Sequence, residues 1–199
     1  MSSDRLIIFL RNPELGEVKT RLAQSVGDTK ALEVYQKLLT HTMDVTNQWN
    51  GKKVLYFTKT VLPGDKTKYK FSKKTQTDGD LGHKMKDAIE AELKKHDKVC
   101  VIGTDCPELS KEILDEAFEA LDLMDVVVGP AIDGGYYLIG MKKVIPELFE
   151  DVEWGTSNVM NATLNQLTRL GLDFHLLEEL SDVDTEQDWK KLKHLVNTN

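Results

Sequence analysis

The sequence lacks the features that mark secreted and membrane proteins. It has 199 residues, only two cysteines, Cys100 and Cys106, and no long apolar run. Two thiols cannot build a disulfide framework, so the simplest interpretation is a reducing cytoplasm. The apolar run 6–10 is shorter than the ~7–15 residues of a signal-peptide core, and Arg11 ends it. We therefore expect a cytoplasmic protein with no membrane partner.

Positive charge is also scarce. The chain carries 26 Lys and Arg against 33 Asp and Glu, a formal net charge of −7. A nucleic-acid partner bound through a general positive field is therefore not expected. Any anionic ligand needs a local basic cluster or a metal ion. The length suits one domain, and no repeat or linker divides it, so residues 1–199 are predicted to form a single domain.

Short apolar runs alternate with helical patterns from end to end. Continuous apolar runs are typical of strands that are covered on both faces, and apolar residues three and four apart are typical of helices packed on them. This alternation predicts an α/β fold, a three-layer α/β/α sandwich with a mostly parallel (mixed) sheet. The expected strands are 6–10, 54–58, 69–75 (weaker), 99–102, 126–128, 136–141 and 174–177.

Local signals place the helix ends. A break is expected near Gly27, and a helix from 81 to about 96. Ser110 is expected to cap a helix that runs to about 121. Another helix opens at Thr156 or Ser157 and stops at Gly171, and Thr185 with Asp188 resembles a capping pair for a terminal helix.

A basic loop follows the first strand. Ligands of open α/β sheets bind at the carboxyl ends of strands, so this place is informative. Residues 11–22 read RNPELGEVKTRL and contain the cations Arg11, Lys19 and Arg21. Cations at a helix N-terminus are unfavourable by ~0.3–1 kcal/mol each, and a bound anion reverses that effect. The loop predicts a phosphate site, with a solvated basic turn as the alternative.

Carboxylates follow two other strands. Asp105 lies in GTDCP, residues 103–107, directly after a buried strand, and such a position suits a hard divalent cation whose shell substrate phosphates and water complete. Helix capping is the alternative, weakened because Ser110 already serves as a cap. Asp182 and Asp184 lie two apart after the last strand, so they are another way to complete a metal site, and here too capping competes.

A glycine-rich loop joins two strands near the middle of the chain. Residues 129–137, GPAIDGGYY, are longer than a hairpin needs, which favours backbone wrapped close to a ligand. Asp133 is the candidate base or hydroxyl acceptor of this loop. A purely structural turn remains the alternative.

Together these segments resemble the bacterial radical-SAM/selenodomain-associated transferase family, within the nucleotide-diphospho-sugar transferase (GT-A-like) superfamily. Two positions depart from the family pattern, Arg11 in place of lysine and Lys84 in place of arginine, and both conserve charge. The matching segments are RNPELGEVKTRL (11–22), QTDGDLGHKM (76–85), GTDCP (103–107), GPAIDGGYYLIG (129–140), WGT (154–156) and DVDT (182–185).

The resemblance implies a GT-A-like fold with Mg²⁺ (or Mn²⁺) on Asp105, and by analogy with related nucleotidylyltransferases on Asp184. It places the nucleotide and the second substrate in different parts of one site. The expected nucleotide- and phosphate-binding residues are Arg11, Lys19, Arg21, Gln76, Asp80, Gly82 and Lys84, and the expected acceptor- or sugar-binding residues are Gly134, Gly135, Tyr136, Trp154 and Thr156.

Two reactions fit this resemblance. The first is metal-dependent glycosyl transfer from a nucleotide-diphosphate sugar to a small-molecule acceptor. The second is nucleotidyl transfer from an NTP to a phosphorylated small molecule, with release of pyrophosphate. Segment 11–22 also resembles a loop of the 2-phospholactate guanylyltransferases, which carry out this reaction. Because a Gly-x-Gly-x-x-Arg loop is absent, we favour glycosyl transfer. A binding module without catalysis is a third reading, and a homodimer is left open.

Overall fold

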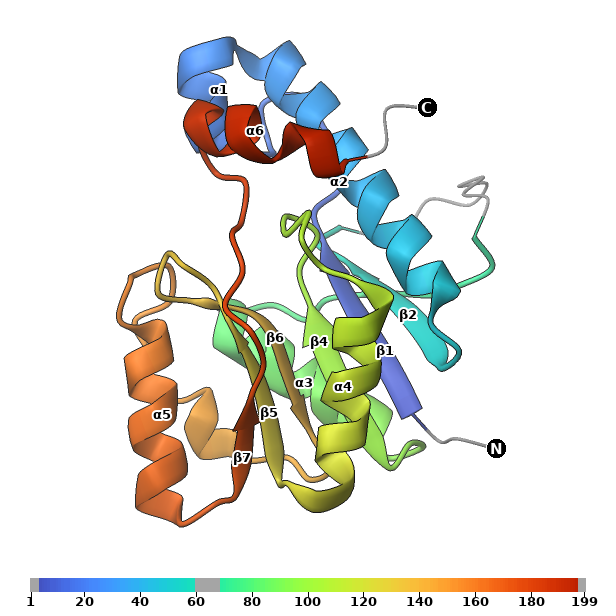
Figure 1. Cartoon of the computed structure of the whole chain (residues 1–199), viewed down its shortest axis with the longest axis vertical. Coiled ribbons are helices and arrows are strands. Elements are labelled where there is room, and N and C mark those ends of the chain that lie inside the picture. The colour runs from blue at the N-terminus through green and yellow to red at the C-terminus, as the bar shows by residue number, and fades with distance from the viewer. Residues whose placement is uncertain (1–3, 60–68, 197–199) are drawn as a thin grey trace.

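The computed structural model describes residues 4–59 and 69–196 as one mixed sheet flanked by helices (Figure 1). The seven strands lie in the order β3-β2-β1-β4-β6-β5-β7, and β6 runs antiparallel to both of its neighbours while the other pairs are parallel. The strands are β1 Asp4–Leu10, β2 Lys52–Phe57, β3 Ser72–Thr75, β4 Lys98–Ile102, β5 Val126–Pro130, β6 Tyr136–Met141 and β7 Phe174–Leu176.

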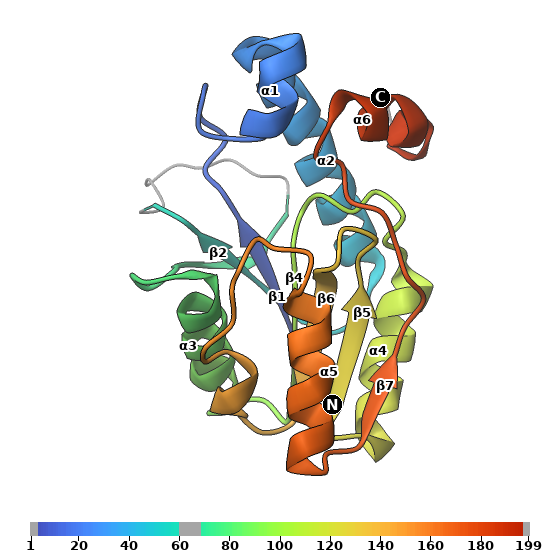
Figure 2. The ribbon, with the colours of Figure 1, turned by 90° about the vertical axis from the view of Figure 1, so that its left-hand side faces the viewer.

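The helices lie on both faces of this sheet (Figures 1 and 2). Leu6 and Ile8 of β1 pack in one cluster with side chains of α2 and α4, whereas Ile7 and Phe9 pack with α3 and α5 on the opposite face. Alternate burial of an all-apolar strand therefore produces the predicted three-layer sandwich. The helices are α1 Thr20–Val26, α2 Asp28–Gln48, α3 Leu81–Leu93, α4 Lys111–Leu123, α5 Val159–Leu170 and α6 Glu186–Leu192, with short 3₁₀ turns at Pro146–Leu148 and Lys193–Leu195.

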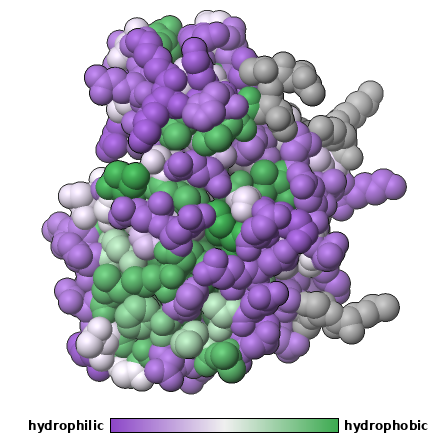
Figure 3. Space-filling model, viewed as in Figure 1, coloured by the Kyte–Doolittle hydropathy of each residue, from purple (hydrophilic) through white to green (hydrophobic). Residues whose placement is uncertain are grey.

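A third, smaller cluster lies beyond the carboxyl end of β1, at the top of Figure 1. It is formed by α1, by α6 and by the first half of α2, and we name this group the helical cap. Its surface is mostly hydrophilic, whereas apolar side chains gather over the sheet region below it (Figure 3). The buried side chains of the cap are Leu22, Ala31, Val34, Leu38, Val183, Leu192 and Val196. The cap thus joins α1 and α2 to the C-terminal segment.

Most local predictions are confirmed. Gly27, at φ 81°, separates α1 from α2, the Ser110 side chain accepts the Ile113 N–H, and Gly171 ends α5 in the left-handed conformation. Thr185 and Asp188 form a complete capping box at α6. The helix expected to run to about residue 96 ends at Leu93. Within the described residues, no helix is long and apolar enough to cross a membrane.

The start of α5 differs from the prediction. The helix begins at Val159, because the Thr156 hydroxyl donates to the Glu153 carbonyl at 2.8 Å and closes a turn before the helix. The strand expected at 126–128 also continues through Pro130, which pairs with Tyr136 of β6. A side-chain bond in the turn accompanies the later start of α5, whereas pairing with β6 across a register shift extends β5.

Candidate active site at the carboxyl edge of the sheet

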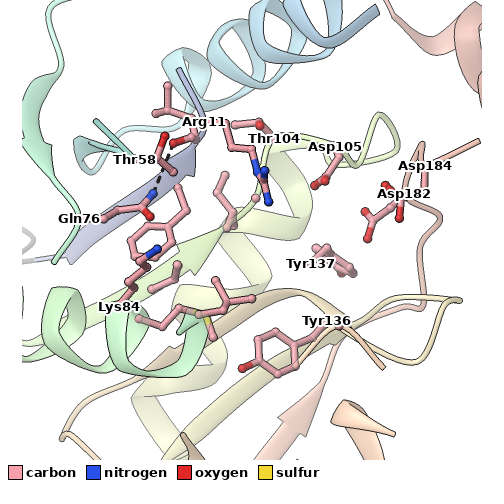
Figure 4. Close-up of a pocket in the computed structure, with 18 of the residues that line it drawn as sticks. Arg11, Thr58, Gln76, Lys84, Thr104, Asp105, Tyr136, Tyr137, Asp182 and Asp184 are labelled. Carbon is pink, nitrogen blue, oxygen red and sulfur yellow. Dashed lines mark hydrogen bonds between the residues drawn. The ribbon is translucent and has the colours of Figure 1, made fainter. Parts of the chain in front are cut away.

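A cavity of about 760 Å³ opens at the carboxyl ends of β1, β2 and β4, beside the helical cap. This volume lies within the ~300–1,000 Å³ of ordinary small-molecule sites. Figure 4 shows acidic side chains on one side of the cavity and Arg11, Gln76 and Lys84 on the other. Of the residues predicted for the site, those that line the cavity are Arg11, Lys19, Arg21, Gln76, Asp80, Lys84, Asp105, Asp133, Tyr136 and Asp184.

Lys19 connects the two predicted metal ligands. Its Nζ lies 3.0 Å from Asp105 Oδ2 and 3.0 Å from Asp184 Oδ1, and only 7% of its side chain is exposed. Arg21 Nη1 lies 3.4 Å from Asp184 Oδ2, but 67% of the Arg21 side chain is exposed. Lys19 is therefore the buried counter-ion of both carboxylates, and Arg21 is a peripheral one.

The electrostatics follow from this pairing. Burial alone lowers the pKa of Lys19, but Asp105 and Asp184 outweigh it and hold that pKa above its ordinary value. Burial raises the pKa of the Asp105 carboxyl, yet the Lys19 ammonium overcomes it and lowers the pKa. For Asp182, burial first and the Asp105 charge second raise the pKa to about 8. The carboxylates of Asp105 and Asp184 thus carry more negative charge than the single ammonium of Lys19 neutralises.

The backbone at Lys19 is unusual. With φ 47° and ψ 47°, Lys19 is in the left-handed region, one of two non-glycine residues there among those described. Such a conformation is unfavourable by roughly 1–3 kcal/mol and persists only where other interactions fix it. The Lys19 carbonyl accepts the Ala23 N–H at 2.9 Å, and the ammonium is held by Asp105 and Asp184.

The acidic side of the cavity is held by backbone bonds. Asp105 follows β4, and its carbonyl accepts the Val183 N–H at 2.9 Å. Val183 is fully buried in the cap, and the Asp184 N–H donates to Asp188 Oδ2 at 3.2 Å. The segment that follows β7 is therefore tied both to the end of β4 and to the start of α6, which fixes the two carboxylates relative to each other.

The opposite side of the cavity is ordered by hydrogen bonds to main-chain groups. The Tyr35 hydroxyl accepts the Arg11 N–H at 2.9 Å and donates to the Arg11 carbonyl at 2.8 Å. The Gln76 amide donates to the carbonyls of Leu10 and Tyr56, at 3.3 and 2.9 Å. Asp80 caps α3, since its Oδ1 accepts the His83 N–H at 2.8 Å. Gln76 and Asp80 thus join strands and helix as well as lining the cavity.

Gly82 packs against Trp154 and the Phe149 carbonyl. It is buried and does not line the cavity. A Cβ at Gly82 would lie 2.5 Å from Trp154 Nε1 and 2.6 Å from the Phe149 carbonyl oxygen. The indole of Trp154 therefore occupies the side of Gly82 toward which a Cβ would point, and contact between Gly82 and the nucleotide stays a prediction.

The glycine-rich loop brings two of its predicted residues to the cavity. Asp133 lines it, with Oδ1 accepting the Gly135 N–H at 2.9 Å, and Tyr136 lines it with its ring edge-on to Trp154. Gly134, at φ 89°, packs closely on the turn before α5. A Cβ at Gly134 would lie 2.2 Å from the Ser157 carbonyl oxygen. Gly134, Gly135, Trp154 and Thr156 are not among the lining residues, and their contact with the acceptor or sugar stays a prediction.

Some lining residues carry no role in the sequence analysis. Asp182 was named only together with Asp184, as a way to complete a metal site, and its buried Oδ1 has no hydrogen-bond partner among the described residues. Thr104 lies inside the GTDCP segment, so the motif contained the signal. Tyr35 lies on the apolar stripe of α2 and gave no signal, and Tyr137, whose hydroxyl donates to the Glu178 carbonyl at 3.0 Å, was likewise not selected.

The donor set bears on the expected metal. In the described ranges, 4–59 and 69–196, no three His, Cys, Asp or Glu side chains are arranged to hold a metal by themselves. Mg²⁺ is usually held by one or two carboxylates with phosphates and water. Asp105 and Asp184, which already share one cation at 3.0 Å each, are a donor set of that type.

Comparison with known structures places the fold. The chain is similar, at TM-score 0.83 and 31% identity, to a "putative nucleotide-diphospho-sugar transferase from Desulfovibrio desulfuricans G20", over 93% of this chain and 84% of that one. It is also similar in fold to a CMP:2-keto-3-deoxy-manno-octonic acid synthetase complexed with CTP, at TM-score 0.61, 12% identity and 98% of each chain. A third similar structure is the manganese complex of Rv0371C from Mycobacterium tuberculosis H37Rv, at TM-score 0.57, 13% identity, 95% of this chain and 97% of that one.

Sequence comparison gives the family. No curated protein matches the chain significantly. Residues 20–156 match the family described as "uncharacterized protein conserved in bacteria (DUF2064)", and this match spans α1 through the turn before α5. The fold is that of the nucleotide-diphospho-sugar transferases, and the chain belongs to the DUF2064 family.

Proposed function

We propose that this protein is a metal-dependent glycosyltransferase that takes a nucleotide-diphosphate sugar as donor and a small molecule as acceptor. One observation carries the proposal: Lys19 and Arg21 meet Asp105 and Asp184 in one cavity at the carboxyl edge of the sheet. Cations and metal-binding carboxylates together suit a diphosphate, because the phosphate oxygens can bind both. The 31% identical Desulfovibrio protein supports a nucleotide-sugar donor.

Asp105 and Asp184 would hold Mg²⁺ or Mn²⁺ in this proposal. When bound, the ion neutralises charge on the departing diphosphate. The manganese complex of the structurally similar Rv0371C supports a divalent cation in this fold. The excess of carboxylates beside Lys19, with Asp182 as a further neighbour, is the electrostatic setting in which an added cation is favourable.

The remaining lining residues divide between the two substrates. Arg11, Lys19 and Arg21 would bind the phosphates, since charge-assisted hydrogen bonds to phosphate are the strongest available here. Gln76, Asp80 and Lys84, which also line the cavity, would bind the nucleotide. Asp133 and Tyr136 would meet the acceptor or the sugar, with Asp133 as the base that takes the proton of the acceptor hydroxyl.

Nucleotidyl transfer is the second candidate. The structurally similar CMP:2-keto-3-deoxy-manno-octonic acid synthetase, complexed with CTP, favours it. In that reaction the same cations and the same carboxylates would bind the triphosphate of an NTP, and pyrophosphate would leave. A departing phosphate must be neutralised in both reactions, so the charged residues alone favour neither.

Product analysis tests the proposal. The protein is incubated with Mg²⁺, a panel of sugar nucleotides or NTPs and candidate acceptors, and the phosphorus-containing products are separated. Release of a nucleoside diphosphate supports glycosyl transfer, whereas pyrophosphate released from an NTP replaces it with nucleotidyl transfer. Asp133→Asn supplies the matched variant: turnover should collapse while nucleotide affinity is retained. Unchanged turnover in Asp133→Asn removes Asp133 from the chemistry.

A further inference from the structure

The ammonium of Lys19 lies where a metal ion would need to bind. It is 3.0 Å from an oxygen of Asp105 and 3.0 Å from an oxygen of Asp184, the two carboxylates assigned to the metal. Only 7% of the Lys19 side chain is exposed. A metal ion that binds both carboxylates must therefore compete with a buried cation that is already hydrogen-bonded to them.

The two carboxylates are fixed, whereas Lys19 has the means to move. The Asp105 carbonyl accepts the Val183 N–H, and the Asp184 N–H donates to Asp188 at the start of α6. Lys19 precedes α1, at the end of the loop from β1, and its backbone is in the strained left-handed region. Its ammonium sits on a flexible four-carbon side chain.

We infer that Lys19 has two alternative partners: the metal carboxylates in the free protein, and the diphosphate of the nucleotide in the loaded protein. Metal and diphosphate then bind as a pair, because the phosphate oxygens attract Lys19 and so release Asp105 and Asp184. Lys19 is a positioning residue that opposes metal binding to the free protein. This inference rests on the proposed function.

Arg21 provides the contrast within the same site. It also contacts Asp184, at 3.4 Å, but its side chain is 67% exposed and it does not contact Asp105. An exposed ion pair of this kind contributes little, because solvent and salt screen it. The structure therefore assigns the competition with metal to Lys19 alone of these two cations.

Titration of Mn²⁺ in the absence of nucleotide tests this assignment, with free Mn²⁺ followed by electron paramagnetic resonance. Lys19→Met should bind Mn²⁺ about tenfold or more tightly than the unmodified protein, within the ordinary range of coupling between two sites. The matched variant Arg21→Met should change the Mn²⁺ affinity less than threefold. The double variant Lys19→Met/Asp105→Asn should lose the gain, which places the bound ion on Asp105.

Lysine labelling gives an independent measurement that needs no variant. In the unmodified protein, reductive methylation of Lys19 should be slow, and it should become faster at Mn²⁺ concentrations that saturate the site. Exposed Lys30 should react at one rate throughout. Bound Mn²⁺ with Lys19 still protected overturns the inference, and this measurement decides the matter if Lys19→Met does not fold.

The outcomes separate this inference from the proposed function. Equal Mn²⁺ affinity of the unmodified protein and Lys19→Met overturns the competition but leaves a metal-dependent transferase intact. A weaker affinity in Lys19→Met also overturns it, and makes Lys19 a supporting residue of the metal site. Absence of Mn²⁺ binding to nucleotide-free Lys19→Met overturns the competition, and absence of Mn²⁺ binding also with a saturating nucleoside diphosphate overturns the metal dependence.

Discussion

The sheet and the helical cap both supply residues to the cavity, but they hold them in different ways. Asp105 follows β4, whose residues Val99–Ile102 are buried. This strand lies between β1, which is parallel to it, and β6, which is antiparallel. Lys19 and Asp184 belong to the cap, are 165 residues apart, and meet through side chains. The cap has a smaller buried cluster than either face of the sheet. The proposed metal ligands are thus divided between the sheet and a unit with a smaller buried core.

This comparison has a physical consequence. Regions with few buried apolar contacts open locally at lower free energy than the core does. We expect the cap to open without the sheet, which would break the Val183–Asp105 backbone bond and take Lys19 and Asp184 away from Asp105. Of the four predictions that follow, the first tests whether the two regions open separately, and the other three test individual residues of the two regions.

Leu22→Ala should give the largest effect. Leu22 is fully buried in the cap, and truncation of such a side chain destabilises by about 2–5 kcal/mol. Hydrogen exchange should accelerate in α1 and α6 while the amides of β1 and β4 keep their rates. Leu6→Ala, in the sheet, is the matched control and should accelerate exchange throughout. Uniform acceleration in Leu22→Ala would show that cap and sheet unfold together.

Asp105→Asn should have the next largest effect. Loss of the proposed metal ligand on the sheet side should lower Mg²⁺-dependent turnover by ~100-fold or more, since metal stabilisation of a departing phosphate is worth several kcal/mol. The circular dichroism spectrum should not change. Exposed Asp122→Asn, on α4, serves as the control. Retained turnover and retained metal dependence in Asp105→Asn would contradict the assignment.

Gly82→Val should affect stability without affecting the site. The added side chain would overlap Trp154 and the Phe149 carbonyl, and overpacking of this kind destabilises by about 1–3 kcal/mol. Below the melting transition, nucleotide affinity should equal that of the unmodified protein, because Gly82 does not line the cavity. Calorimetry with a nucleoside diphosphate measures both quantities. A stable Gly82→Val that no longer binds would restore Gly82 to the nucleotide site.

The smallest effect should be a pH dependence at Asp182. Burial and the nearby Asp105 charge raise the pKa of Asp182 to about 8, from an ordinary 3.8. Between these pH values the folded protein holds a proton that the unfolded chain has lost, so this group makes stability fall as pH rises. Asp182→Asn should remove this pH-dependent contribution to the stability of the fold. Its melting temperature should exceed that of the unmodified protein by a few degrees at pH 9 and match it near pH 4.

Salt separates this effect from general charge repulsion. The net charge of −7 also makes the protein less stable at high pH, but that contribution is screened between exposed charges. The difference between Asp182→Asn and the unmodified protein should persist at 0.5 M NaCl, because the Asp182 carboxyl is largely buried. A difference that disappears with added salt would contradict the assigned pKa.

The sequence by itself determined the layers and the edge of the sheet at which the site lies. Continuous apolar runs such as Leu6–Leu10 can only be buried on both faces, and strand–helix alternation then requires a three-layer α/β fold. Because ligands gather at the carboxyl ends of such strands, Asp105 and the basic loop 11–22 were identified without coordinates. Short local signals, including the Thr185 and Asp188 capping box, were equally sufficient.

Tertiary structure alone decided which residues touch. Whether Gly82 meets a ligand or an indole depends on where the turn before α5 packs, and no local pattern around residue 82 encodes the position of Trp154. Lys19 was predicted for a phosphate, yet its partners in the structure are Asp105 and Asp184, since the cap brings α1 and the segment before α6 together. Long-range packing of Leu22, Val183 and Leu192 sets that contact, and packing between distant segments leaves no periodic trace in either one.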